Sequence, residues 1–169
     1  MAVADCVASY GDWIVTYMNS VRHLDHLTAA SASSVFWIGM VTGRILLSGV
    51  TERIGIQWSV AAYIVLSIVA QITFQALTNV AGLLSMLAAV GFFFGPFFPS
   101  GIVLLANKLP IHTHVGAVSA AAALGQVGGA TCPLIVGFMA DAFGMARLLD
   151  VATVLTGVLL AVWVAFCRS

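Results

Sequence analysis

Four polar side chains near the start of the sequence have the spacing of one helical face. Asp5, Ser9, Asp12 and Thr16 are separated by four, three and four positions, so a helix brings them to the same side. An ionised Asp in lipid costs at least about 2.5 kcal/mol, which favours a polar cavity or solute path beside this stripe. Desolvation would let either carboxyl group exchange a proton near neutral pH, so proton coupling is a further hypothesis. The alternative places Asp5 among lipid headgroups and Asp12 in a hydrogen bond inside a bundle.

Three other side chains are candidates for contact with a solute. Gln126 lies among glycines, and its amide needs a hydrogen-bond partner within an apolar segment. Trp37 and the phenylalanine-rich run that contains Phe94 offer ring faces on which a sugar-like or aromatic solute can stack. The same residues also fit a structural interpretation, in which Gln126 bonds to a neighbouring helix and the rings pack together or face lipid.

The composition shows what must position these side chains. Hydrophobic residues make up 62% of the chain and charged residues 7%, whereas a soluble domain carries about 25% charged residues. The chain therefore needs lipid as its main solvent. A net charge of zero excludes nucleic-acid binding as its main role. The sequence has no nucleophile–base or metalloprotease motif, and its histidine pairs lack further ligands, so we expect no enzymatic activity, cofactor or metal site.

Six apolar segments account for most of the chain. They are about twice the length of a membrane β-strand and do not alternate in polarity, which favours helices. We predict an all-α membrane protein with one six-helix bundle over residues 1–169 and helices at 2–18, 29–47, 58–77, 80–105, 115–139 and 148–167. Four of the six basic residues fall on the even-numbered links and the C-terminus, so both termini are expected in the cytoplasm; these are Arg44, Arg53, Lys108 and Arg168.

Glycines and prolines mark the expected contacts between helices. Pairs of glycines four positions apart allow backbones to approach closely in lipid and occur in the second, fourth and fifth segments: Gly39 and Gly43, Gly91 and Gly95, Gly125 and Gly129. Pro96 and Pro99 predict a kink in the fourth segment, because proline removes a helical hydrogen bond. Such a kink either is static or serves as a gate beside a pathway.

Two helix ends suggest an internal repeat. The second segment ends with Glu52 and the fifth with Asp141, each followed three positions later by glycine, and the two acids are 89 positions apart. A helical count places these ends on opposite sides of the membrane, as in two inverted repeats of three helices. The alternative is that the acidic residue and glycine only cap two helices.

The stretch Glu52-Arg53-Ile54-Gly55, preceded by Gly43-Arg44, resembles the signature loop between helices eight and nine of the major facilitator superfamily. Ser48 replaces the first Gly of that signature, and Glu52 replaces its Asp. The run from Gly91 to Leu105, with Gly125-Gln-Val-Gly-Gly and the segment ending in Asp141, is similar to the fucose-permease-like branch and its fungal members. The resemblance covers nearly the whole chain and matches helices seven to twelve.

The resemblance implies secondary transport of a small, sugar-like solute by alternating access between two six-helix bundles. The expected partners are membrane lipid and either a missing amino-terminal bundle or a second copy, and the family suggests the plasma membrane. The first helix corresponds to one that lines the central cavity. The resemblance also implies that Arg44, Glu52, Arg53 and Asp141 act as a conformational latch, with Glu52 near the start of the fifth helix. The alternatives are weakly paired interfacial charges and, for the chain as a whole, a non-transporting remnant or membrane interaction module.

Overall fold

The computed structural model describes residues 10–168, with the side chains at 10, 12, 111, 132, 136, 139–143 and 146 left aside. Its helices are α2 (Tyr10–Ser20), α3 (His26–Ile54), α4 (Ile56–Ala76), α5 (Val80–Phe94), α6 (Phe97–Lys108), α7 (His114–Phe143) and α8 (Leu148–Arg168), with short 3-10 helices at Ile111–Thr113 and Met145–Arg147. The described part contains no strand. The predicted all-helical architecture is therefore confirmed.

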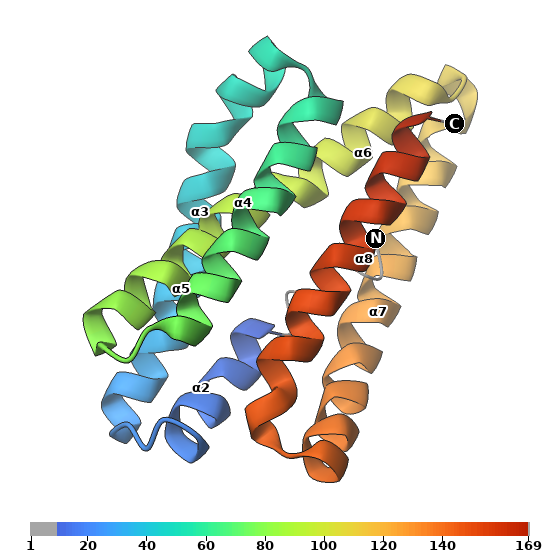
Figure 1. Ribbon diagram of the computed structural model, residues 1–169. Coiled ribbons are helices and arrows are strands. Elements are labelled where there is room, and N and C mark those ends of the chain that lie inside the picture. The colour runs from blue at the N-terminus through green and yellow to red at the C-terminus, as the bar shows by residue number, and fades with distance from the viewer. Residues whose placement is uncertain (1–9, 169) are drawn as a thin grey trace.

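The long helices run between two ends of the molecule. The α3–α4 turn, the α6–α7 link and the C-terminus lie at one end, and the α2–α3, α4–α5 and α7–α8 links lie at the other (Figure 1). Five helical stretches within the described residues are long and apolar enough to cross a membrane. Gly55 makes the α3–α4 turn with a φ of 102°, a conformation that costs glycine little. The multi-pass arrangement follows from these spans and short links.

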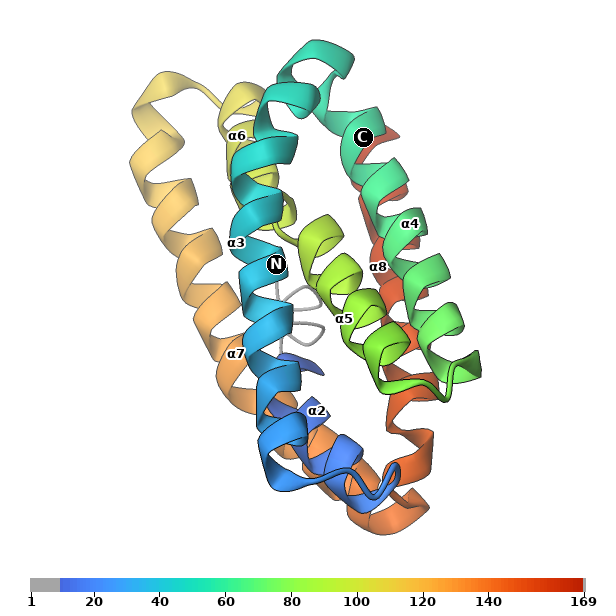
Figure 2. The same ribbon diagram turned by 90° about the vertical axis from the view of Figure 1, so that its left-hand side faces the viewer.

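The core is built around the contact of α3 with α5. Seen from the side, α5 crosses between α3 and α4 (Figure 2). Phe36 of α3 and Leu87 and Val90 of α5 are completely buried there. In lipid, the close packing of these side chains stabilises the contact through dispersion. This contact fixes how α3 is held against the fourth membrane span.

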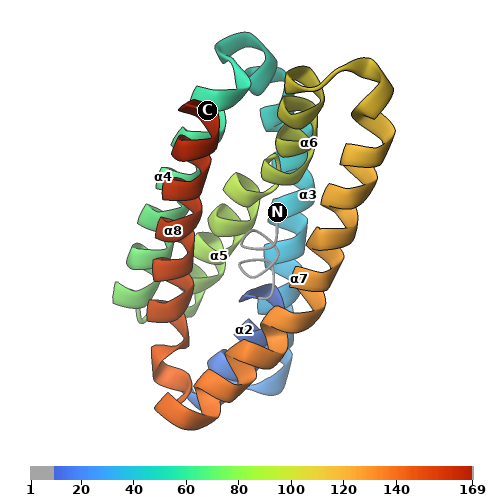
Figure 3. The same cartoon turned by 90° about the vertical axis from the view of Figure 1, so that its right-hand side faces the viewer.

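Polar side chains join α4 to α8, which lie side by side (Figure 3). Gln71 Nε2 donates to Thr156 Oγ1 at 3.1 Å and to Ser67 Oγ at 3.4 Å. Gln75 Nε2 donates to Thr153 Oγ1 at 3.3 Å, one turn further along. If the six helices form two inverted repeats of three, α4 and α8 are the equivalent third helices of the two repeats. Their contact is compatible with such a repeat, which remains a prediction.

α7 stands at the edge of the bundle (Figures 2 and 3). Only 12% of its candidate span is buried, against 44% for the spans that contain α4 and α5. The expected inner contact of Gly125 and Gly129 in this helix stays a prediction, whereas the tight contacts between glycines and backbone atoms join α3 to α5. The exposed face of α7 includes the large apolar side chains Leu124, Val127 and Leu134.

Candidate functional site at the break between α5 and α6

The fourth membrane span is divided near its middle. The span covers Val80–Lys108, yet α5 ends at Phe94 and α6 begins at Phe97, with Gly95 and Pro96 between them. Pro99 has no N–H, so it cannot donate to the Gly95 carbonyl four positions earlier. The Ser100 amide resumes helical bonding by donating to the Pro96 carbonyl at 3.0 Å. The prediction that Pro96 and Pro99 disturb this helix is thus matched by a local break in its hydrogen bonding, while Gly95 and Pro96 keep helical backbone angles.

Arg44 of α3 fills the position that Pro99 leaves open. Its Nε donates to the Gly95 carbonyl at 3.2 Å, and one terminal nitrogen lies 3.5 Å from Met40 Sδ. Arg44 is four residues past the midpoint of α3, which corresponds to about 6 Å along the axis. The charged side chain therefore lies near the middle of a candidate membrane span, next to the break, and it is exposed at the bundle surface.

Glycines let α3 approach the break closely enough for this bond. A methyl group at Gly43 would lie against the Phe92 carbonyl, with its carbon at 2.7 Å, and one at Gly95 would lie 2.8 Å from the Arg44 amide nitrogen. Gly39 and Gly91 are in similarly tight contact with the Ala88 and Phe36 carbonyls. The predicted role of these four glycines in close helix contact is confirmed. Small residues make such packing possible in lipid, where dispersion contacts drive helix association.

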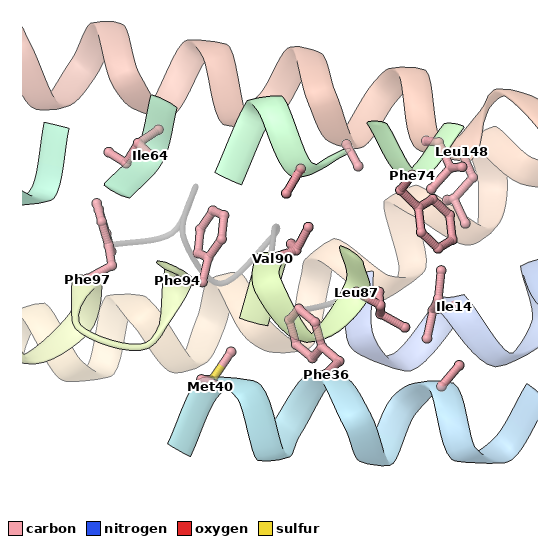
Figure 4. Packing of buried hydrophobic residues seen from close by; sticks show 14 of the residues in the cluster. Ile14, Phe36, Met40, Ile64, Phe74, Leu87, Val90, Phe94, Phe97 and Leu148 are labelled. Atoms are coloured by element: carbon pink, nitrogen blue, oxygen red, sulfur yellow. The ribbon is translucent and has the colours of Figure 1, made fainter. Parts of the chain in front are cut away.

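Aromatic side chains flank the break on its inner side. Phe94 and Phe97 lie on the two sides of the turn, and Met40 of α3 lies nearby (Figure 4). The ring centroids of the two phenylalanines are 6.5 Å apart, and Phe97 is 5.3 Å from Trp163 of α8. Phe94 is 7% exposed, so in this conformation it packs in the core and a solute does not reach it.

The other expected pathway residues are dispersed. Asp5 and Ser9 lie outside the described residues, as does the side chain of Asp12. Thr16 is exposed on α2 and Gln126 is exposed on α7. Trp37 is 41% exposed and meets Phe36 edge to face at 5.6 Å. Trp37 precedes Arg44 by seven positions, and two helical turns place both on one side of α3.

The expected latch role stays a prediction, and the structure describes three of its four side chains. Glu52 and Arg53 are exposed at the end of α3, eight and nine positions beyond Arg44, which is at least about 12 Å along the axis. The Asp141 side chain is outside the described residues. Sequence reasoning grouped Arg44 with the loop and missed its bond to Gly95. The one signal in the sequence was Pro99 four positions after Gly95, and the sequence does not reveal which helix supplies the donor.

A family model covers nearly the whole chain. The sequence model of the Major Facilitator Superfamily matches residues 2–168. The chain is 32% identical over 139 residues to a glucose/galactose transporter of Brucella abortus, covering 81% of this chain and 33% of that protein. It is 26% identical over 145 residues to "Bypass of stop codon protein 6" of Saccharomyces cerevisiae, covering 80% of this chain and 29% of that protein.

A solved structure has the same fold. The nucleoside transporter NupG superposes with a TM-score of 0.76 over 96% of this chain and 41% of its own length, at 17% identity. The chain thus spans about a third of the two relatives and less than half of NupG. These proportions correspond to one bundle of a two-bundle fold.

Proposed function

The chain belongs to the major facilitator superfamily, and on that premise we propose that it is the carboxy-terminal bundle of a secondary transporter for a small sugar-like solute. Transport would proceed by alternating access, with a second six-helix bundle forming the opposite wall of the pathway. That bundle is either an amino-terminal half outside this sequence or a second copy. We further propose the plasma membrane as its location, with both termini in the cytoplasm.

The break at Gly95 and Pro96 is the observation that carries this proposal. Backbone carbonyls that prolines leave without a helical donor at membrane depth must be satisfied by protein or by a water-filled cavity, and interrupted helices form solute sites in many transporters. Here the break divides a 29-residue span near its middle and has Arg44 beside it at a similar depth. A bundle with only a passive packing role does not need a charge in that position.

The solute class is supported by a relative and by the exposed side chains. The Brucella abortus protein is a glucose/galactose transporter, and hydroxyl-rich solutes bind through hydrogen bonds with an aromatic ring against one face. Trp37 and Gln126 are exposed on α3 and α7, the two helices that we place toward the second bundle. A solute between the bundles would contact these helices first.

Binding is the first property to measure. The purified chain in lipid nanodiscs would be heated with increasing galactose or glucose, with glycerol at the same concentration as the control. A saturable rise in the unfolding temperature is expected with a sugar and not with glycerol, because a ligand that binds only the folded state stabilises it. A rise with glycerol equal to the rise with the sugars would contradict the proposed solute class.

A further inference from the structure

The Arg44 guanidinium has donors that the described residues do not use. Nε and one terminal nitrogen face the Gly95 carbonyl and Met40 Sδ, which occupies one edge of the planar group. The opposite edge consists of the two terminal nitrogens, and in the described part of the chain no acceptor is bonded to it. That edge has the spacing to hold both oxygens of a carboxylate.

The charge of Arg44 also needs compensation. A guanidinium at membrane depth costs at least about 2.5 kcal/mol when it is not paired. The acidic side chains that the structure describes are Asp25, Glu52 and Asp150, all at helix ends or links, and none is within ion-pair distance of Arg44. The Gly95 carbonyl offers a partial charge only. The side chains of Asp5, Asp12 and Asp141 lie outside the described residues. An anion that reaches Arg44 would pair with its charge.

We propose that Arg44 is an intramembrane carboxylate site, so that the solute class of the proposed transporter includes sugar acids with one negative charge. The inference rests on the proposed function in that the Arg44 side of α3 must face the solute path. One guanidinium balances one negative charge, whereas a phosphate monoester carries about two. Arg53, nine positions further along α3, is too distant to balance the second.

The site is held in place by the break itself. Because Pro99 cannot donate to Gly95, the Gly95 carbonyl remains free to accept from Arg44 and fixes the inner edge of the guanidinium. Arginine suits this arrangement better than lysine, since only its planar fork bonds a carbonyl on one edge and a carboxylate on the other. Binding of the carboxylate and the geometry of the α5–α6 break are thereby linked through one side chain.

The test compares glucuronate with glucose, which differ in the carboxylate. Unfolding temperatures of the chain in nanodiscs are measured against each solute at constant ionic strength, with glucose 6-phosphate as a third ligand. The variants are Arg44→Gln, Arg44→Lys and, as a matched control on the same helix, Arg53→Gln. We expect glucuronate to bind the unsubstituted chain and Arg53→Gln at least about tenfold more tightly than Arg44→Gln, with Arg44→Lys in between.

Each outcome decides between the two proposals. Binding of neutral glucose without any preference for glucuronate overturns the carboxylate site and leaves the proposed function intact. Glucuronate binding that is equal in Arg44→Gln and Arg53→Gln also overturns it. Loss of glucuronate binding in Arg44→Gln alone, with glucose binding retained, supports it. Stronger binding of glucose 6-phosphate than of glucuronate contradicts the selection for a single charge. The absence of binding by every solute contradicts the carboxylate site, which consists of residues of this chain alone.

Discussion

The contact of α3 with α5 leads to the sharpest stability prediction. Gly43→Ala introduces a methyl group against the Phe92 carbonyl, with its carbon 2.7 Å away and the Phe92 Cα 2.9 Å away. These are backbone atoms and cannot rotate aside, and the carbonyl oxygen is closer still, so α3 and α5 must separate by more than about 0.7 Å to restore an ordinary contact of 3.4 Å. Overpacking of this kind costs about 1–3 kcal/mol. The gain in helix propensity from glycine to alanine returns at most about 1 kcal/mol.

Gly49→Ala is the matched control for this substitution. Gly49 lies in the same helix, and a methyl group there meets nothing within 4 Å, so only the propensity gain of about 0.5–1 kcal/mol applies. The free energy of unfolding would be measured in mixed micelles by titration with SDS, followed by circular dichroism. We expect Gly43→Ala to be less stable than Gly49→Ala by about 1–3 kcal/mol. Equal stability of the two variants would refute the close approach of α3 and α5.

Three further substitutions test the polar contacts. Arg44→Gln is expected to lower the free energy of unfolding by about 1 kcal/mol less in a Pro99→Ala background than alone, because the introduced alanine would supply an N–H to the Gly95 carbonyl. A double-mutant cycle in micelles checks this. Purely additive costs would contradict the capping of the Gly95 carbonyl by Arg44. Gln71→Leu removes a buried bond to Thr156 and is expected to lower stability by about 0.6–1.7 kcal/mol in the SDS titration, whereas an unchanged midpoint would show that the bond contributes nothing. Lys108→Met removes the donor to the Phe166 carbonyl at 2.7 Å and the ammonium group 4.7 Å from the Phe166 ring centre. The expected loss of stability is below about 1 kcal/mol, and high salt reduces it. A larger or salt-independent loss would argue against a weak electrostatic contribution of Lys108.

Sequence periodicity and composition were enough to predict the class of fold. Lipid requires that each span satisfies its own backbone hydrogen bonds, so long apolar segments leave helices as the only solution. The glycine pairs of α3 and α5 were informative for the same reason, since Gly39, Gly43, Gly91 and Gly95 have no other use at that depth than close contact. The break at Pro96 followed from the chemistry of proline.

Tertiary relations were beyond the reach of the sequence. Trp37, Phe94 and Gln126 looked equivalent as candidates, yet Phe94 is buried while Trp37 and Gln126 are exposed. Arg44 looked like a member of the loop signature, although the helix continues for ten residues beyond it and places it near the middle of the span. These differences depend on which helices become neighbours, and short local patterns carry no such information.

Sugar uptake by a hybrid transporter tests the central claim most directly. In the hybrid, this chain replaces the region of the Brucella abortus glucose/galactose transporter that it matches, and uptake of labelled galactose is measured in liposomes. If the chain is the carboxy-terminal bundle of a sugar-like solute transporter, the hybrid takes up galactose saturably above empty liposomes. A hybrid that is inserted and folded, with the unfolding temperature of the parent, but shows no uptake would contradict the account.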